Sequence, residues 1–160
     1  MHDNILGFYL KASEKQDLRD IVRYLFSRVK DQLGTVYVGE FVREYNFYDV
    51  YNAKKDEFNF GKFYDFLGSC LYYKKLSFVL FPFRTKGEMT TTLNQYLESE
   101  SIFACKCWDY TNAYFFFKRP KELEEAYDAC KMFLLDDFRL ITTGNCTDDI
   151  SFCRGIHNLE

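Results

Sequence analysis

The stretch "CKCWDYTNAYFFFKRP", from Cys105 to Pro120, decides the fold of this chain. Two aromatic-rich apolar runs, 102–108 and 113–118, flank a polar loop of four residues from Asp109 to Asn112. Aromatic residues favour strands, and two such runs around a short polar loop predict a β-hairpin. Strands joined in this way are antiparallel, so the sequence predicts an α+β fold rather than a parallel α/β sheet.

Cys105 and Cys107 stand one residue apart in this hairpin and raise the question of a metal or redox site. In the expected register they share a face with Phe103, and Cys105 lies opposite Phe116. Side chains at i and i+2 of a strand stand roughly 6.6 Å apart, which is wide for two ligands of one ion. The C-x-C and C-x6-C spacings are unusual for zinc sites, and no C-x-x-C redox motif occurs. We therefore expect buried structural thiols, with no metal and no cofactor.

Hydrophobic periodicity extends the hairpin into a single domain, residues 1–160, with a mostly antiparallel sheet of about four to five strands and about four helices. The expected strands are 5–11, 35–42, 76–84 and the two hairpin arms, and the expected helices are 14–33, 60–73, 88–99 and a last one from Pro120 through Phe138. Residues 43–58 are expected to be irregular or helical. Residues 144–160 are expected to form an irregular tail, whose final Leu159-Glu160 we interpret as a cloning remnant.

The first helix has the clearest local signals. Ser13 is expected as its N-cap, with Gln16 completing a capping box, and Gly34 as the residue that follows its C-terminus. Apolar residues at helical spacing predict a buried face made of Leu18, Ile21, Val22, Leu25, Val29 and Leu33.

The last helix is expected to begin at Pro120, a favoured first-turn residue, with acidic residues nearby that match the helix dipole. Its expected buried face consists of Leu123, Tyr127, Cys130, Leu134 and Phe138. Its opposite side is expected to expose a row made of Glu125, Asp128, Met132 and Asp136.

Aromatic residues are unusually frequent, with 18 Phe, 13 Tyr and 1 Trp among 160 residues. Phenylalanine fills cores, but each buried tyrosine hydroxyl needs a hydrogen-bond partner. Tyrosine is also enriched at protein interfaces. The surplus tyrosines are therefore interpreted either as half-buried rings at the edge of the core or as part of a binding surface.

The net charge of −3 argues against non-specific binding of nucleic acid by the whole protein. Residues 120–150, however, hold eight acidic and three basic side chains. This acidic region is either a solvated surface or a landing patch for a basic partner.

Familiar catalytic motifs are missing from the sequence. It contains no P-loop, no G-x-G-x-x-G and no G-x-S-x-G, and its two histidines, His2 and His157, lie near the chain ends. The sequence contains no run of 18 apolar residues that would predict a membrane helix, and the first residues lack the features of a signal peptide. We therefore expect a cytoplasmic protein that is not an enzyme.

Small size, acidic charge, abundant aromatics and missing motifs give the chain the general character of bacterial immunity proteins, antitoxins and small phage inhibitors, although no motif identifies a family. We therefore expect a non-enzymatic inhibitor that covers the active surface of a cognate toxin. A nuclease toxin would have a basic surface that is complementary in charge to the acidic residues of 120–150. The residues expected to bind this partner are Glu122, Glu125, Asp128, Met132, Asp136, Asp148 and Asp149.

Two alternatives to this hypothesis stay open. The first is an enzyme or small-ligand-binding domain with a pocket lined by aromatic residues. The second, with less support, is a nucleic-acid-binding module that uses the interleaved lysines and aromatic residues of 54–75.

Overall fold

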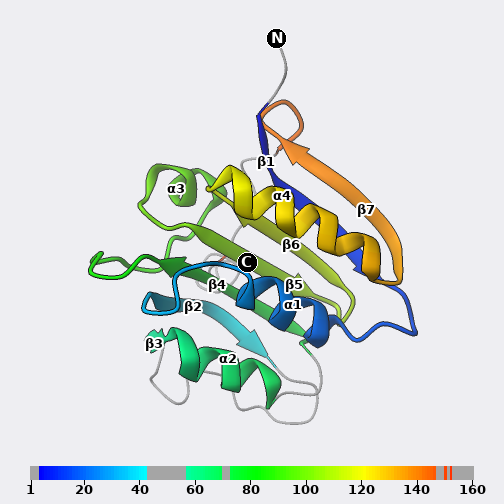
Figure 1. Ribbon diagram of the computed structural model, residues 1–160, viewed down its shortest axis with the longest axis horizontal. Coiled ribbons are helices and arrows are strands. Elements are labelled where there is room, and N and C mark those ends of the chain that lie inside the picture. The colour runs from blue at the N-terminus through cyan, green and yellow to red at the C-terminus, as the bar shows by residue number, and fades with distance from the viewer. Residues whose placement is uncertain (1–3, 43–56, 70–72, 147–149, 151, 153–160) are drawn as a thin grey trace, which may run out of the picture.

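A seven-stranded sheet forms the centre of the computed structural model, which describes residues 4–42, 57–69, 73–146, 150 and 152. Its strand order is β3-β2-β4-β5-β6-β1-β7, and every neighbouring pair is antiparallel (Figure 1). The strands are β1 (Ile5–Ala12), β2 (Thr35–Val42), β3 (Glu57–Asn59), β4 (Lys75–Phe81), β5 (Phe103–Trp108), β6 (Asn112–Phe117) and β7 (Leu135–Thr142). The helices in this part of the chain are α1 (Leu18–Ser27), α2 (Phe60–Gly68), α3 (Leu93–Glu98) and α4 (Pro120–Ala129), and a 3-10 turn (Cys130–Met132) follows α4.

The predicted α+β class, the mostly antiparallel sheet and the four helices are confirmed, but the sheet has more strands than predicted. The two additional strands are β3 and β7, which form the two edges of the sheet. Both edge strands depend on partners that are distant or weakly marked in the sequence, and local periodicity did not reveal them.

The helices divide between the two faces of the sheet. In Figure 1, α1, α2 and α4 lie on the side of the sheet that faces the viewer, which we call the first face. The opposite, second face carries a smaller core, in which Leu93 and Tyr96 of α3 pack with Phe152. Strand alternation produces this division: Cys105 faces the first core, whereas the adjacent Ala104 belongs to the second.

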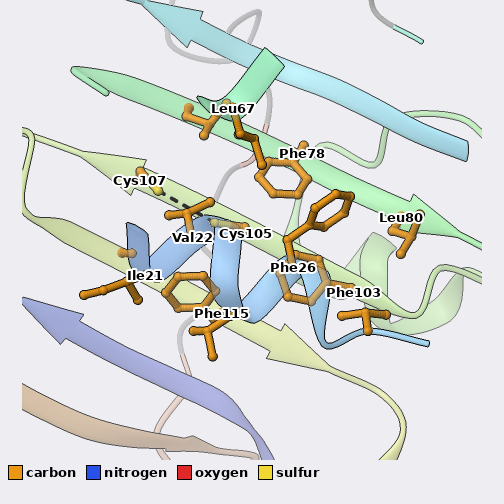
Figure 2. Close-up of a cluster of buried hydrophobic side chains, with 14 of the residues drawn as sticks. Ile21, Val22, Phe26, Leu67, Phe78, Leu80, Phe103, Cys105, Cys107 and Phe115 are labelled. Atoms are coloured by element: carbon orange, nitrogen blue, oxygen red, sulfur yellow. Dashed lines mark hydrogen bonds between the residues drawn. The ribbon is translucent and has the colours of Figure 1, made fainter. Parts of the chain in front are cut away.

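Phenylalanine side chains dominate the first core. Phe26 projects from α1 toward β4 and β5, where its ring centroid lies 5.5 Å from that of Phe78 and 6.0 Å from that of Phe103 (Figure 2). It also stacks on Phe60 of α2 at 4.2 Å, and Phe63 meets it edge-on. One aromatic side chain thus joins two helices to the middle of the sheet.

The first helix is shorter than the predicted range 14–33. Asp17, not Ser13, is its N-cap, because the Asp17 carboxylate accepts a hydrogen bond from the Arg19 N–H at 2.9 Å. The buried stripe is confirmed from Leu18 through Val29, but Leu33 is 70% exposed. The helix ends at Ser27, and the chain then turns so that β2 can begin at Thr35.

Gly34 has a different role from the predicted helix C-terminus. Its backbone passes so close to β4 that a Cβ atom would stand 2.4 Å from the Phe81 carbonyl oxygen. Glycine is therefore required here for close approach of two strands.

The central hairpin is confirmed, but its register differs by one residue from the prediction. Asn112 is the first residue of β6 and pairs with Trp108, so the loop has three residues, from Asp109 to Thr111. Asp109 and Tyr110 both adopt positive φ angles, 51° and 68°, which turn the chain within this short loop. Cys105 consequently lies opposite Phe115 rather than Phe116, and both face the first core.

The prediction of one long last helix is wrong. The helix α4 ends at Ala129, and Phe138 lies on β7. The expected buried face breaks down accordingly, because Tyr127 and Leu134 are exposed and Leu123 is only partly buried. From Leu135 onward, side chains alternate between the two faces of the sheet, as in a strand, and this strand pairs along its length with β1.

The strands β1 and β2 match their predicted ranges to within one residue, and β4, α2 and α3 lie at their predicted positions with shorter bounds. The strand β4 ends at Phe81, directly before Pro82, as expected for a residue without a backbone donor. Asn59 caps α2 and Thr92 caps α3. Residues 43–56, with Cys70 and Leu71 of the predicted helix 60–73, lie outside the described residues. In the predicted irregular tail, Ile150 and Phe152 are buried against the second face.

Candidate interaction surface

Part of the second face is closed and part is open. The closed part is covered by α3, Ile150 and Phe152, and the hydroxyl of Ser77 donates a hydrogen bond to the Phe152 carbonyl. Two rows of side chains on this face run across the strands, as the pairing registers define, and the first begins at Glu40 and Ser77, which are buried. The first row is Glu40, Ser77, Lys106, Tyr114, Tyr9 and Arg139. The second row is Lys75, Trp108, Asn112, Lys11 and Asp137.

Three aromatic rings form a cluster at the centre of these rows. We call Tyr9, Trp108 and Tyr114 the aromatic cluster, and each ring is partly exposed. The centroids of Trp108 and Tyr114 lie 4.8 Å apart, and that of Tyr9 lies 5.8 Å from Tyr114 and 5.9 Å from Trp108. The Tyr9 hydroxyl donates a 2.6 Å hydrogen bond to Asn112 Oδ1. Mutual packing and this bond hold the rings in fixed positions on the sheet.

Arg139 of the edge strand completes the cluster. Its guanidinium lies over the Tyr9 ring, 4.7 Å from the centroid, and pairs with the Asp137 carboxylate at 3.4 Å. Burial, with a smaller contribution from Asp137, raises the pKa of Tyr9 above its usual value. A tyrosine hydroxyl is protonated at neutral pH in any case, so Tyr9 is a hydrogen-bond donor to Asn112.

Lysine side chains surround the aromatic cluster. Lys106 is partly buried, and this burial lowers its pKa; nearby Lys75 lowers it further and Glu40 opposes the change. Among the described residues, no carboxylate lies within 4.0 Å of the ammonium groups of Lys11, Lys75 or Lys106. With respect to the described residues, these three ammonium groups are therefore unpaired positive charges, on a protein whose net charge is −3.

A hollow of about 260 Å³ opens beside the aromatic cluster. It is lined by Tyr9, Tyr114, Arg139, Leu140, Ile141, Asn145, Cys146 and Ile150. The Asn145 side chain fixes its rim, because it donates to the Leu140 carbonyl and accepts from the Thr142 N–H. The size and mixed lining suit a single side chain or a small ligand.

The predicted acidic row is not a single surface. Glu122 is only 6% exposed, and its Oε2 accepts a hydrogen bond from the Lys30 N–H at 2.5 Å and lies 3.7 Å from Arg119. Glu125 lies 3.9 Å from Arg28 and 4.0 Å from Lys30. Both glutamates therefore tie α4 to the connection after α1, and basic side chains of this protein already balance their charge.

The other residues expected to bind a partner lie on separate elements. Asp128 is exposed and pairs with Lys131 at 3.3 Å. Met132, in the 3-10 turn, is 64% exposed, and Asp136 is an exposed residue of β7. Asp148 and Asp149 lie outside the described residues. The acidic excess counted in the sequence is thus divided between internal ion pairs and scattered exposed carboxylates.

The cysteine pair lies deep in the first core. Cys105 and Cys107 are fully buried, with their sulfur atoms 3.7 Å apart (Figure 2). Burial and then the contact with Cys107 raise the pKa of Cys105 well above its usual value, and burial raises that of Cys130 to about 12. Such thiols stay protonated, which disfavours nucleophilic attack and metal binding. Within the described ranges, no three His, Cys, Asp or Glu side chains are grouped as metal ligands.

Comparisons with protein-family models, curated proteins and solved structures find no match to this chain. No family can therefore be assigned to it. Within the described part of the chain, no helix has the length and apolar character needed to cross a membrane.

Sequence reasoning did not single out Tyr9, Trp108, Tyr114 or Arg139 as a site. A signal was present in the hairpin, where Trp108 and Tyr114 alternate with residues that face the first core. That alternation marks side chains on the opposite face, but only the sheet order shows that Tyr9 joins them.

Proposed function

We propose that the protein is a non-enzymatic inhibitor that binds another protein through the aromatic cluster on its second face. In its most specific form, the proposal is an immunity protein or antitoxin that neutralises a cognate toxin by covering its active surface. The observation that carries the proposal is the gathering of two tyrosines, the single tryptophan and Arg139 on one open part of a sheet. Tryptophan, tyrosine and arginine dominate binding hot spots between proteins.

The cluster is also held in place before any partner arrives. Trp108 and Tyr114 pack against each other, and Tyr9 is fixed between the Asn112 side chain and the Arg139 guanidinium. Rings that are already ordered lose little further rotamer freedom on binding, so more of the contact energy becomes affinity. A rigid aromatic surface of this kind suits a folded protein partner.

A nucleic-acid partner is less well supported by this geometry. Bases stack on open aromatic faces, but the Arg139 guanidinium covers one face of Tyr9. The Trp108 and Tyr114 rings are tilted 39° to each other and packed together, so they do not form successive open stacking platforms. The net charge of −3 also opposes the approach of a phosphate backbone.

A ligand-binding function is a second candidate because of the hollow of about 260 Å³ beside the aromatic cluster. Tyr9 and Tyr114 form part of its wall, and Arg139 and Asn145 supply polar groups. The same hollow suits a side chain that a protein partner inserts, and this is the role that we propose for it.

The test is to identify the partner with the wild-type protein and then measure the affinity of variants for the purified partner. Trp108→Ala should weaken binding about tenfold or more, the loss typical of a hot-spot residue. Phe83→Ala is the matched control, because Phe83 is a 52% exposed aromatic residue outside the aromatic cluster. Equal affinity of wild type and Trp108→Ala would show that the second face is not part of the interface. Recovery of a bound small molecule in place of a protein would favour the ligand-binding candidate.

A further inference from the structure

We propose that the partner presents an acidic surface to the aromatic cluster, with carboxylates placed against Lys11, Lys75 and Lys106. This inference rests on the proposed function and adds the chemistry of the partner at that same site. It differs from the basic partner that the acidic residues 120–150 suggest, because the open part of the second face has the opposite charge.

The positions of the lysines support this inference. Lys75 is paired directly with Trp108 across β4 and β5, and Lys106 is paired with Tyr114 across β5 and β6. Lys11 lies opposite Asn112, next to the Tyr9 side of the cluster. A positive group therefore stands beside each aromatic ring, and a partner that covers the rings must also meet the lysines.

The described residues do not supply the negative charges that these lysines lack. Glu40 is 7% exposed and is the acidic residue that acts on Lys106, but the two do not come within ion-pair distance. Asp137 is engaged by Arg139. The two rows thus contain four basic residues, Lys11, Lys75, Lys106 and Arg139, against two acidic ones, Glu40 and Asp137.

Lys106 adds a physical reason for a carboxylate partner. Its side chain is partly buried, so its ammonium group has already lost part of its hydration in the free protein. An incoming carboxylate therefore displaces less water from Lys106 than from a fully exposed lysine, and it interacts at a lower local dielectric constant. Complementary charge of this kind raises the association rate and excludes partners of the wrong sign.

The first experiment measures the local potential through Trp108, the only tryptophan of the chain. Its fluorescence should be quenched about twofold more effectively by iodide than by caesium, each normalised to free N-acetyltryptophanamide, because positive potential concentrates anions. Lys11→Glu with Lys75→Glu should reverse this preference. Lys121→Glu, on the exposed surface of α4, is the matched control and should leave it unchanged. Equal quenching by the two ions, or stronger quenching by caesium, would contradict the inference.

The second experiment measures binding with probes of defined chemistry. Three probes are titrated separately while Trp108 emission is followed. Two are 12-residue peptides in which tyrosine alternates with glutamate or with lysine, and the third is oligothymidylate. The glutamate peptide should bind, and its affinity should fall with added salt and with Lys75→Glu. Tighter binding of the lysine peptide, tighter binding of oligothymidylate, or no response to any probe would each contradict an acidic partner.

The purified partner distinguishes this inference from the proposed function. If Trp108→Ala weakens the complex but Lys75→Glu strengthens it, the partner is basic at this site and only the inference fails. If Trp108→Ala leaves the affinity unchanged, the binding face itself is wrong, and the proposed function on this face fails as well.

Discussion

The two faces of the sheet use the same strands for different purposes. Along β5, Cys105 and Cys107 point into the buried core under α1, α2 and α4, while Lys106 and Trp108 point to a surface that stays partly open. The first face is filled with phenylalanine, which has no polar group, and the second gathers tyrosine, tryptophan and lysine. The comparison teaches that stability and binding can be separated on one strand, so substitutions on the two faces should have different effects.

The largest expected effect is on the first face. Phe26→Ala removes a ring through which α1 contacts α2 and the centre of the sheet, and it should lower the free energy of unfolding by about 3–5 kcal/mol. Urea denaturation measures this change. A loss below about 1 kcal/mol would show that the first face is not the main source of stability.

The second prediction concerns Cys130, whose pKa is raised by burial to about 12. Because the folded thiol holds its proton more tightly than the unfolded one, its contribution to stability is complete below about pH 9. It is lost as the pH rises toward 12, at no more than about 1.4 kcal/mol per pH unit. Cys130→Ala should therefore flatten this part of the curve of unfolding free energy against pH. An unchanged slope would show that the thiol is not buried as described.

The third prediction concerns the link between α4 and the connection after α1. Glu122→Gln keeps the shape of the side chain but removes the charge that meets the Lys30 N–H and Arg119. The free energy of unfolding should fall by about 1–3 kcal/mol, as for other buried charged hydrogen bonds. Thermal unfolding measures this loss of stability, and the Glu124→Gln variant, at an exposed neighbouring position, is the control. Equal stability of the two variants would return Glu122 to the set of candidate partner-binding residues.

On the second face, Trp108→Ala should cost only about 1 kcal/mol of stability, because the ring is partly exposed and loses mainly its contacts with Tyr114 and Tyr9. Urea denaturation in parallel with Phe26→Ala compares the two faces directly. A loss as large as that of Phe26→Ala would mean that the aromatic cluster is a second structural core and not a binding surface.

The smallest expected effect is on exposed acidic residues. Asp128→Lys with Asp136→Lys should change the free energy of unfolding by less than about 0.5 kcal/mol, since both side chains are solvated. If the basic partner predicted from the sequence contacts this region, the double variant should also slow association at low salt. Stopped-flow measurement with the purified partner tests this, and an unchanged rate would exclude these residues from the interface.

Local patterns in the sequence were sufficient for the centre of the fold. The hairpin of β5 and β6 was predicted because its two arms are adjacent in the chain, and the buried stripe of α1 was predicted from its helical spacing. The strand β7 was missed because Leu123, Tyr127 and Leu134 continue a helical spacing by coincidence. Its pairing with β1 joins two segments that lie far apart in the sequence, and local periodicity contains no information about such distant partners.

The candidate site could not be predicted for the same physical reason. Tyr9 and Trp108 are brought together only by the order of β1, β6 and β5 in the sheet. The count of acidic residues did not show their ion pairs either, because Arg28 and Lys30, which lie near Glu125, come from a distant segment. Composition indicated a surplus of tyrosine, but only the strand order of the sheet shows that Tyr9 and Tyr114 lie next to Trp108.

The most direct test of the binding face uses the single tryptophan of the chain. Protein labelled with 5-fluorotryptophan gives one ¹⁹F resonance, from Trp108, and the purified partner is added to saturation while this resonance is followed. Our account predicts that the resonance shifts or broadens on binding, and that it does so equally in the Phe83→Ala control. A fully formed complex in which the Trp108 resonance keeps its free position would contradict the assignment of the aromatic cluster as the interface.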